Sequence, residues 1–155
     1  MNENLLSDAI KIYGNSVLRT AVCITGNLQD AEDVFSDVFF AAWQADKPFE
    51  SDKHFKAWLI RVTVNKAKNI RKQAHNRYKA ELTENIPYPD MEEKSGFDVP
   101  CALLRLKPKE RAVLFLHYYE GYTYGEIASM LKMREVSVRS KALRARAHMK
   151  DFLLE

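Results

Sequence analysis

Glycine and proline are scarce in this chain of 155 residues, with five of each, and cysteine occurs only twice. So few helix-breaking residues favour a helical protein. Cys23 and Cys101 are far apart and neither belongs to a CxxC pair, so we expect reduced thiols and a cytoplasmic location. No run of eighteen apolar residues occurs, and residues 1–4 do not resemble a signal peptide, so we expect no membrane insertion.

The residue sets that support catalysis are also missing. None of the histidines pairs with a cysteine or a second histidine at metal-ligand spacing: His54, His75, His117 and His148. The chain has no glycine-rich phosphate loop and no nucleophile elbow. Asp33 and Asp37 lie one turn apart, but nothing nearby supplies a cleft. We therefore expect no enzyme activity, no metal and no cofactor.

Charge is distributed in blocks. Residues 1–52 carry a net charge of −6, residues 53–79 carry +9 without one acidic side chain, residues 80–99 carry −5 and residues 100–155 carry +5. Two basic blocks between acidic ones indicate two surfaces that face a polyanion. Solvated helix faces that happen to cluster are the alternative.

The apolar periodicity predicts three helices in the first half, at about 4–25, 30–45 and 53–77. Gly26 is expected to end the first, Asp30 to cap the second and Pro48 to follow it. The apolar stripe of the first helix consists of Leu5, Ile12, Val17, Leu18, Ala21 and Val22.

The second half predicts a helix-turn-helix. A helix over 109–119 is expected to bury Tyr119, and Thr123 with Glu126 forms a capping box for the next helix. After a break near 132–134, a final basic helix runs over 135–153. The fold class is therefore all-α: two small helical domains, 1–79 and 101–155, joined by a flexible acidic linker over 80–100 that contains three prolines.

The final helix is the candidate for reading duplex DNA, because the second helix of such a unit enters the major groove by its N-terminal part. Arginine reads guanine, whereas lysine and serine mostly contact the backbone. The candidate residues are Arg134, Glu135, Ser137, Val138, Arg139, Lys141 and Arg144. An amphipathic helix with a solvated basic face is the alternative.

The helix over 53–77 is the candidate for single-stranded DNA. Its cations and amides share one strip, and aromatic residues lie around it, a combination that suits phosphates and stacked bases. Phe55 and Trp58 fit the core, which leaves Phe49 in the preceding loop to touch a base. The candidate residues are Phe49, Arg61, Asn65, Lys68, Asn69 and Lys72.

The helix over 30–45 has a different surface. Asp33 and Asp37 lie on one face with Ser36 and Phe40 beside them. This acidic and apolar patch suits a protein partner with a basic surface, and ordinary solubility explains it equally well.

Three segments carry a resemblance to a known family. They are Ala31 to Trp43, Phe55 to Asn69 with its Ala57-Trp58-Leu59 core, and Leu106 to Arg146 with Gly121-Tyr122-Thr123 and Ser137-Val138-Arg139. In this order they resemble bacterial RNA polymerase sigma factors of the extracytoplasmic-function (ECF) group, over nearly the whole chain outside the linker.

The resemblance implies a mechanism. The face with Asp33, Ser36, Asp37 and Phe40 would bind the clamp helices of the largest subunit of core RNA polymerase. The 53–77 helix and the loop before it would melt the −10 promoter element and hold a flipped base. The final helix would read the −35 element, and the linker would lie along the RNA path. An anti-sigma factor would hold the protein inactive.

The chain departs from the family pattern at several positions. Ser36 stands where glutamine is usual and Ala41 where arginine is frequent, which bears on polymerase binding. Lys132 replaces a turn glycine, so we expect a turn that is either strained or differently shaped. Arg134-Glu135-Val136 replaces a Ser-x-Gly pattern, which bears on the −35 sequence that is read.

Two other functions fit part of the sequence. A stand-alone helix-turn-helix regulator would account for residues 109–146 alone, and the N-terminal half does not fit it. A sigma-like decoy that binds only protein partners would account for the departures at Ser36 and Val136.

Overall fold

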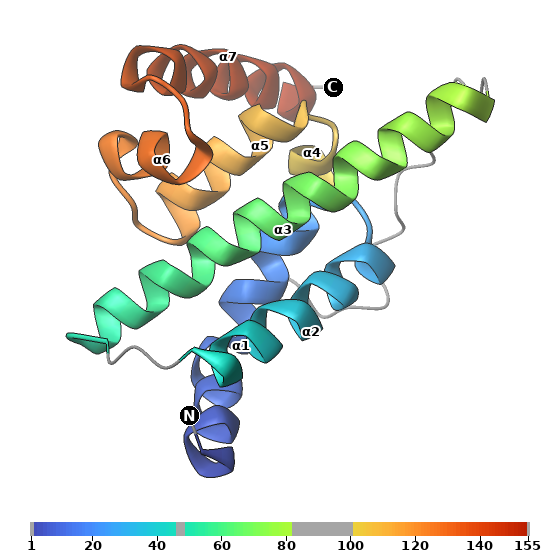
Figure 1. Cartoon of the computed structure of the whole chain (residues 1–155). Coiled ribbons are helices and arrows are strands. Elements are labelled where there is room, and N and C mark those ends of the chain that lie inside the picture. Colours follow the sequence, from blue (N-terminus) through green and yellow to red (C-terminus); the bar gives the residue numbers. More distant parts are fainter. Residues whose placement is uncertain (1, 46–48, 82–100, 155) are drawn as a thin grey trace.

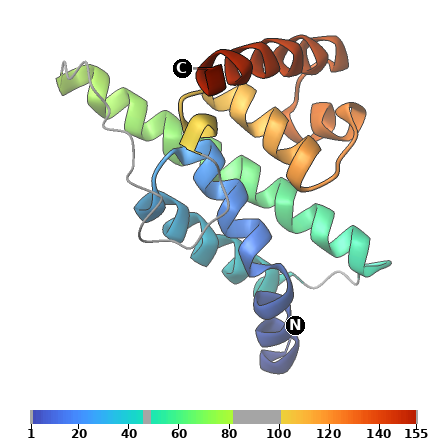
Figure 2. The same ribbon diagram turned by 180° about the vertical axis from the view of Figure 1, so that it is seen from behind.

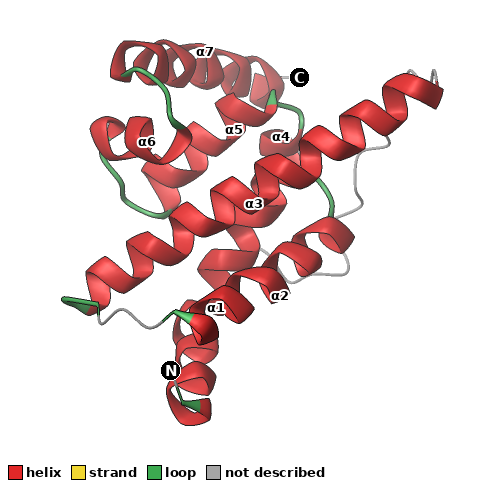
Figure 3. Cartoon of the chain, viewed as in Figure 1, coloured by secondary structure: helices red, strands yellow, loops and turns green. Residues whose placement is uncertain are grey.

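The computed structural model describes residues 2–45, 49–81 and 101–154, and every regular element in these ranges is a helix (Figures 1 and 3). The predicted all-α class is confirmed. The helices are α1 (Glu3–Thr25), α2 (Leu28–Gln44), α3 (Asp52–Glu81), α4 (Cys101–Leu104), α5 (Pro108–Leu114), the π-helical turn η1 (Phe115–Tyr119), α6 (Tyr124–Leu131) and α7 (Glu135–Leu154). The predicted linker, 80–100, lies outside the described residues except at its first two positions, which belong to α3.

The first three helices pack on one another and form an N-terminal unit. Gly26 ends α1 in the left-handed conformation, as predicted, with φ of 80°. Asn27, not Asp30, caps α2, because the Asn27 side-chain oxygen accepts a hydrogen bond of 2.8 Å from the Asp30 backbone N–H. Asp30 lies in the first turn instead, where its charge suits the positive end of the helix.

The core of this unit differs from the predicted stripe of α1. Leu5 and Ile12 are 56% and 68% exposed, so their assignment to the core is wrong. The buried line of α1 passes through Ala9 and Val17, and Leu5 and Ile12 lie beside that line. The N-terminal end of α1 also extends beyond the other helices (Figure 1).

The C-terminal unit is built from α4 to α7. The predicted capping box is confirmed: Thr123 Oγ1 accepts from the Glu126 N–H, and Glu126 Oε1 accepts from the Thr123 N–H, each at 3.1 Å. The helix predicted over 109–119 changes to a π-helical turn at Phe115. The wider turn leaves Tyr119 49% exposed, so its predicted burial is wrong.

The two units pack together, with α1 and α3 of the first against α5, η1 and α6 of the second (Figures 1 and 2). Arg111 of α5 is 4% exposed and donates to the backbone oxygens of Cys23, Leu104 and Leu106. Cys23 lies in the last turn of α1, which contains no basic residue of its own. Arg111 therefore places a positive charge at the negative end of a helix in the other unit.

In a second contact, the N-terminal unit supplies the donor and the C-terminal unit supplies the acceptor. Lys68 of α3 donates from Nζ to the backbone oxygen of Leu131, the last residue of α6, at 2.8 Å. The last turn of α6 also has no basic residue. An ion pair of 3.1 Å between Lys56 Nζ and Glu120 Oε2 adds a third link, in which Glu120 is nearly buried. Each unit thus supplies a cation to a helix C-terminus of the other.

Candidate nucleic-acid interface

The turn between α6 and α7 is tight. Lys132 ends α6 with φ of 55° and ψ of 48°, and it is the non-glycine residue with positive φ among the described residues. A side chain in this left-handed conformation costs roughly 1–2 kcal/mol, so the predicted strain is confirmed. Met133 N–H closes the turn on the Ala128 oxygen at 2.9 Å. The chain is thereby redirected so that α7 begins at Glu135.

One face of α7 is buried against the unit and the other faces solvent. Val138, Ala142 and Ala145 are fully buried. Val138 was predicted to contact DNA, and that prediction is wrong, because its side chain belongs to the core. The other predicted residues, on α7 or directly before it, have exposed or half-buried side chains: Arg134, Glu135, Ser137, Arg139, Lys141 and Arg144.

Arg139 is held in place before any ligand binds. Its Nη2 lies 2.8 Å from Glu135 Oε1, one turn earlier, and its guanidinium lies 5.3 Å from the centroid of the Tyr124 ring. Tyr124 is itself stacked on His117, with ring centroids 4.2 Å apart. The aromatic residues were not predicted from the sequence. The available signal was the position of Tyr124 at the start of α6, the first helix of the predicted helix-turn-helix, whereas His117 lies in η1.

A shallow hollow lies beside the start of α7. Four cations line it, Lys109, Arg134, Lys141 and Arg144, together with Ser137 and Ser140. No acidic side chain is among the residues that line it. Cations and hydroxyls without a nearby carboxylate suit phosphate oxygens.

The predicted strip of α3 is only partly free. Arg61, Asn69 and Lys72 are exposed and Asn65 is half-buried. Lys68 contacts Leu131 of the C-terminal unit, so it is not free for DNA in this arrangement.

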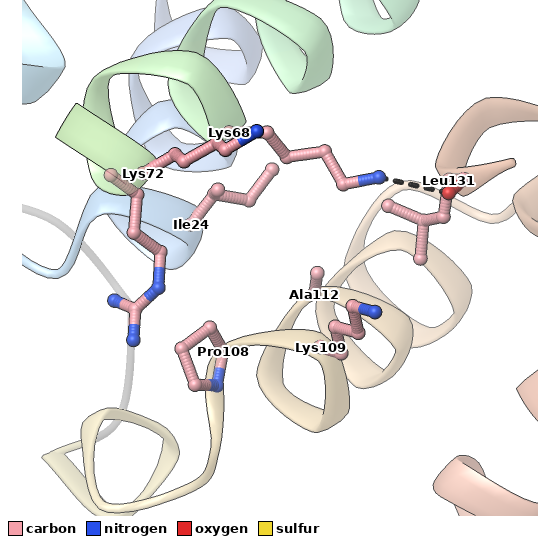
Figure 4. A pocket seen from close by; sticks show the side chains of 8 residues that line it. Ile24, Lys68, Lys72, Pro108, Lys109, Ala112 and Leu131 are labelled. Atoms are coloured by element: carbon pink, nitrogen blue, oxygen red, sulfur yellow. Dashed lines mark hydrogen bonds between the residues drawn. The ribbon is translucent and has the colours of Figure 1, made fainter. Parts of the chain in front are cut away.

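Lys68 crosses a cavity of about 300 Å³ between the units, whose floor is apolar (Ile24, Pro108, Ala112, Leu131) and whose other lining residues include Arg71, Lys72 and Lys109 (Figure 4). Burial, and then the charges of Lys109 and Lys132, lower the pKa of Lys68. Burial also lowers the pKa of Arg71. Several cations are therefore held close together where the units meet.

The aromatic residues near the start of α3 form one cluster. The Phe49 ring lies 4.7 Å from Phe55 and 5.3 Å from Trp58, between ring centroids. Phe49 is half-buried by these contacts, and Phe55 and Trp58 pack against the core. Phe49 therefore stays partly accessible to solvent while its ring packs against Phe55 and Trp58.

The exposed face of α2 is acidic and apolar, as the sequence indicates. Asp33, Ser36 and Asp37 are exposed, and Phe40 is 55% exposed. Trp43, one turn further, is 46% exposed and was not among the predicted residues. Its spacing of three from Phe40 places it on the same face.

The Cys23 thiol is enclosed. Burial raises the pKa of the Cys23 thiol to about 12, so it stays protonated at neutral pH and is a poor nucleophile or ligand. In the described parts of the chain, no three His, Cys, Asp or Glu side chains lie together in a way that would hold a metal. Nor does any described helix have the length and apolar character needed to cross a bilayer.

Both halves of the chain match models of one protein family. Residues 9–77 match "Sigma-70 region 2" and residues 97–149 match "Sigma-70, region 4". The RNA polymerase sigma factor NccH of Alcaligenes xylosoxydans is 29% identical over 93% of this chain and 84% of its own length. The ECF RNA polymerase sigma factor SigE of Mycolicibacterium smegmatis is 28% identical over 94% of this chain, which spans 60% of that relative.

The fold also has a solved counterpart. The sigma factor RpoE of Bartonella quintana, crystallised with the anti-sigma factor NepR, superposes with a TM-score of 0.73 over 98% of both chains, at 19% identity. The region 2 match covers α1 to α3, and the region 4 match covers the helix-turn-helix. This chain belongs to the sigma-70 family of transcription initiation factors and, within it, to the ECF group.

Proposed function

We propose that this chain acts without catalysis of its own, in the cytoplasm, by binding core RNA polymerase and directing it to promoters. The observation that carries the proposal is the pair of cationic surfaces on separate units, one on α7 and one on α3, with an acidic and apolar face on α2. The domain matches to both halves disfavour a stand-alone helix-turn-helix regulator, which would leave α1 to α3 unexplained.

The −35 element would be read by α7. Arg139 is the candidate for a guanine contact, because Glu135 and Tyr124 restrict its side chain before binding. The cations of the hollow, Lys141 and Arg144 among them, would bind phosphates and fix the register of the helix. The hydroxyl group of Ser137, which also lines the hollow, suits a contact with the DNA backbone or with a base edge.

The −10 element would be opened at α3. Asn65 and Asn69 can hydrogen-bond an unpaired base, and Arg61 and Lys72 can bind the strand that carries it. The exposed part of the Phe49 ring would stack on a base. Extrusion of one base costs a few kcal/mol, which these contacts must offset.

The contact of Lys68 bears on how the two units are arranged when DNA is bound. In the packed arrangement its ammonium group contacts the Leu131 oxygen. A role of Lys68 at the −10 element therefore requires α6 to leave α3. The NepR complex shows that a relative of this fold binds an anti-sigma factor. We propose that this chain is restrained by such a partner.

The division of labour between the units can be tested with Arg139→Ala. We expect this change to weaken binding to promoters with a −35 element by roughly tenfold to hundredfold, since one lost base contact costs about 1–3 kcal/mol. Promoters that lack the element should bind the variant holoenzyme and the unchanged holoenzyme about equally. The measurement is filter binding of reconstituted holoenzyme to matched promoter pairs. Equal losses on both promoters would contradict the assignment.

The companion change is Asn65→Ala. We expect closed-complex affinity to stay the same and the rate of strand opening to fall by roughly tenfold, because the base contact forms only after melting. Permanganate reactivity of unpaired thymines measures opening. Premelted promoter DNA with a mismatched −10 region should reduce the defect. A loss of closed-complex affinity would instead show that Asn65 acts before melting.

A further inference from the structure

The solvent face of α7 carries an apolar line. Val136 is 77% exposed and Leu143 is 65% exposed, and the exposed Ser140 lies between them. The spacings of four and three place the three side chains on one line along the helix. No described element covers this line, although Val138 and Ala142 bury the opposite face.

Cations border the line on both sides. At about 100° per residue, Arg139 and Arg146 fall on one side of it, and Lys141 and Arg144 fall on the other. A helix with its side chains is about 10–12 Å wide, close to the width of the major groove of B-DNA, so Arg146 on one side and Lys141 with Arg144 on the other can face the two phosphate walls. Arg139 lies nearer to the apolar line than Arg146 and can therefore reach a base edge. The apolar line then faces the floor of the groove.

The groove floor offers one apolar group. Guanine, adenine and cytosine present hydrogen-bond donors and acceptors there, and at C5 cytosine carries only a hydrogen atom, whereas thymine carries a methyl group. Val136 is the second residue of α7, and the first turns of a recognition helix are the part that contacts bases. Its isopropyl group has no hydrogen-bonding atom, so it gains from a methyl group and gains nothing from a polar base edge.

We propose that Val136 selects thymine at one position of the −35 element through contact with the thymine methyl group. The inference rests on the proposed function, because it requires α7 to enter the major groove. An apolar surface for a protein partner is the competing explanation. The cations on both sides of the line favour DNA, because they lie where two phosphate strands would run, and Lys141 and Arg144 line the same hollow as Val136.

The test removes only the methyl group from the DNA. Once the −35 element is known from mapped start sites, each of its thymines is replaced in turn by 2′-deoxyuridine, and the affinity of holoenzyme for each duplex is measured. We expect one replacement to weaken binding about fourfold, the effect of one buried methyl group. For Val136→Ala we expect the thymine and uracil duplexes to bind equally at that position. Both affinities should equal the affinity of the unchanged protein for the uracil duplex.

Leu5→Ala is the matched control. It shortens another exposed aliphatic side chain, on α1 and far from α7, and should retain the fourfold methyl effect. Val136 is exposed and alanine is a better helix former, so the variant is expected to fold normally.

Three results would overturn the inference. The first is that no thymine of the element is sensitive to loss of its methyl group, and the second is a methyl effect that persists in Val136→Ala. The third is that Val136→Ala loses affinity for core polymerase or an anti-sigma factor while its DNA preference is unchanged, which would identify a protein-binding surface. Failure of the proposed function looks different, because no protein-dependent start sites would then be found.

Discussion

Replacement of Arg111 by methionine is expected to lower the free energy of unfolding by about 2–4 kcal/mol. The Arg111 guanidinium is buried and donates to the backbone oxygens of Cys23, Leu104 and Leu106. Each carbonyl that loses a charged donor without gaining water costs roughly 1–3 kcal/mol, and removal of a buried charge returns part of the total. Methionine is shorter than arginine but keeps an unbranched chain and most of the volume, so the hydrogen bonds of the guanidinium are the main loss.

Urea unfolding followed by far-ultraviolet circular dichroism measures this change. Lys107→Met is the matched control, since Lys107 is exposed and belongs to the same region. Its effect should stay within about 0.5 kcal/mol. A similar value for both variants would show that Arg111 does not hold the units together.

Reversal of two charges on α2 is expected to have the largest effect on polymerase binding. Asp33→Arg with Asp37→Arg should weaken the affinity for core polymerase at least hundredfold, about 2.7 kcal/mol, because like charges placed face to face cost several kcal/mol. Both side chains are exposed, so the fold should be unaffected. The proposed partner surface is basic, and Phe40 and Trp43 supply the apolar part of the contact.

Biolayer interferometry with immobilised core polymerase measures this affinity. Glu50→Arg with Asp151→Arg makes the same change in net charge at exposed positions elsewhere and is the control. The control should bind almost as tightly as the unchanged protein. Equal weakening by both pairs would indicate a general effect of net charge, and the assignment of α2 as the contact would be wrong.

Local sequence signals predicted the helices well. The capping box at Thr123 and Glu126, the stop at Gly26 and the strained turn at Lys132 each depend on residues within a few positions, and all three are confirmed. The errors arise where burial or helix geometry depends on residues that are close in space but distant in the sequence. Leu5 fits an apolar stripe, but the packed line of α1 runs beside it. The π-helical turn at Phe115 changes the helical phase, which periodicity alone does not reveal.

The candidate site was predicted only in part, because local sequence signals identify its charged helices but not its long-range contacts. Charge and composition identify α7 and α3 as basic, and most of the named side chains are exposed. Val138 was wrongly included because it lies within a basic run, although its phase on the helix points to the core. The contacts of Lys68 with Leu131 and of Arg111 with Cys23 join residues far apart in the chain, so a sequence reading cannot find them.

The central claim is that this protein directs polymerase to promoters, and run-off transcription tests it most directly. Purified core polymerase is assayed with and without the protein on a fragment library of the genome that encodes it. We predict discrete new start sites that depend on the protein and share two sequence elements upstream. Tight binding to core polymerase without any new start site would contradict the claim and identify a decoy. Tight binding to duplex DNA by the protein alone, again without new start sites, would identify a stand-alone regulator.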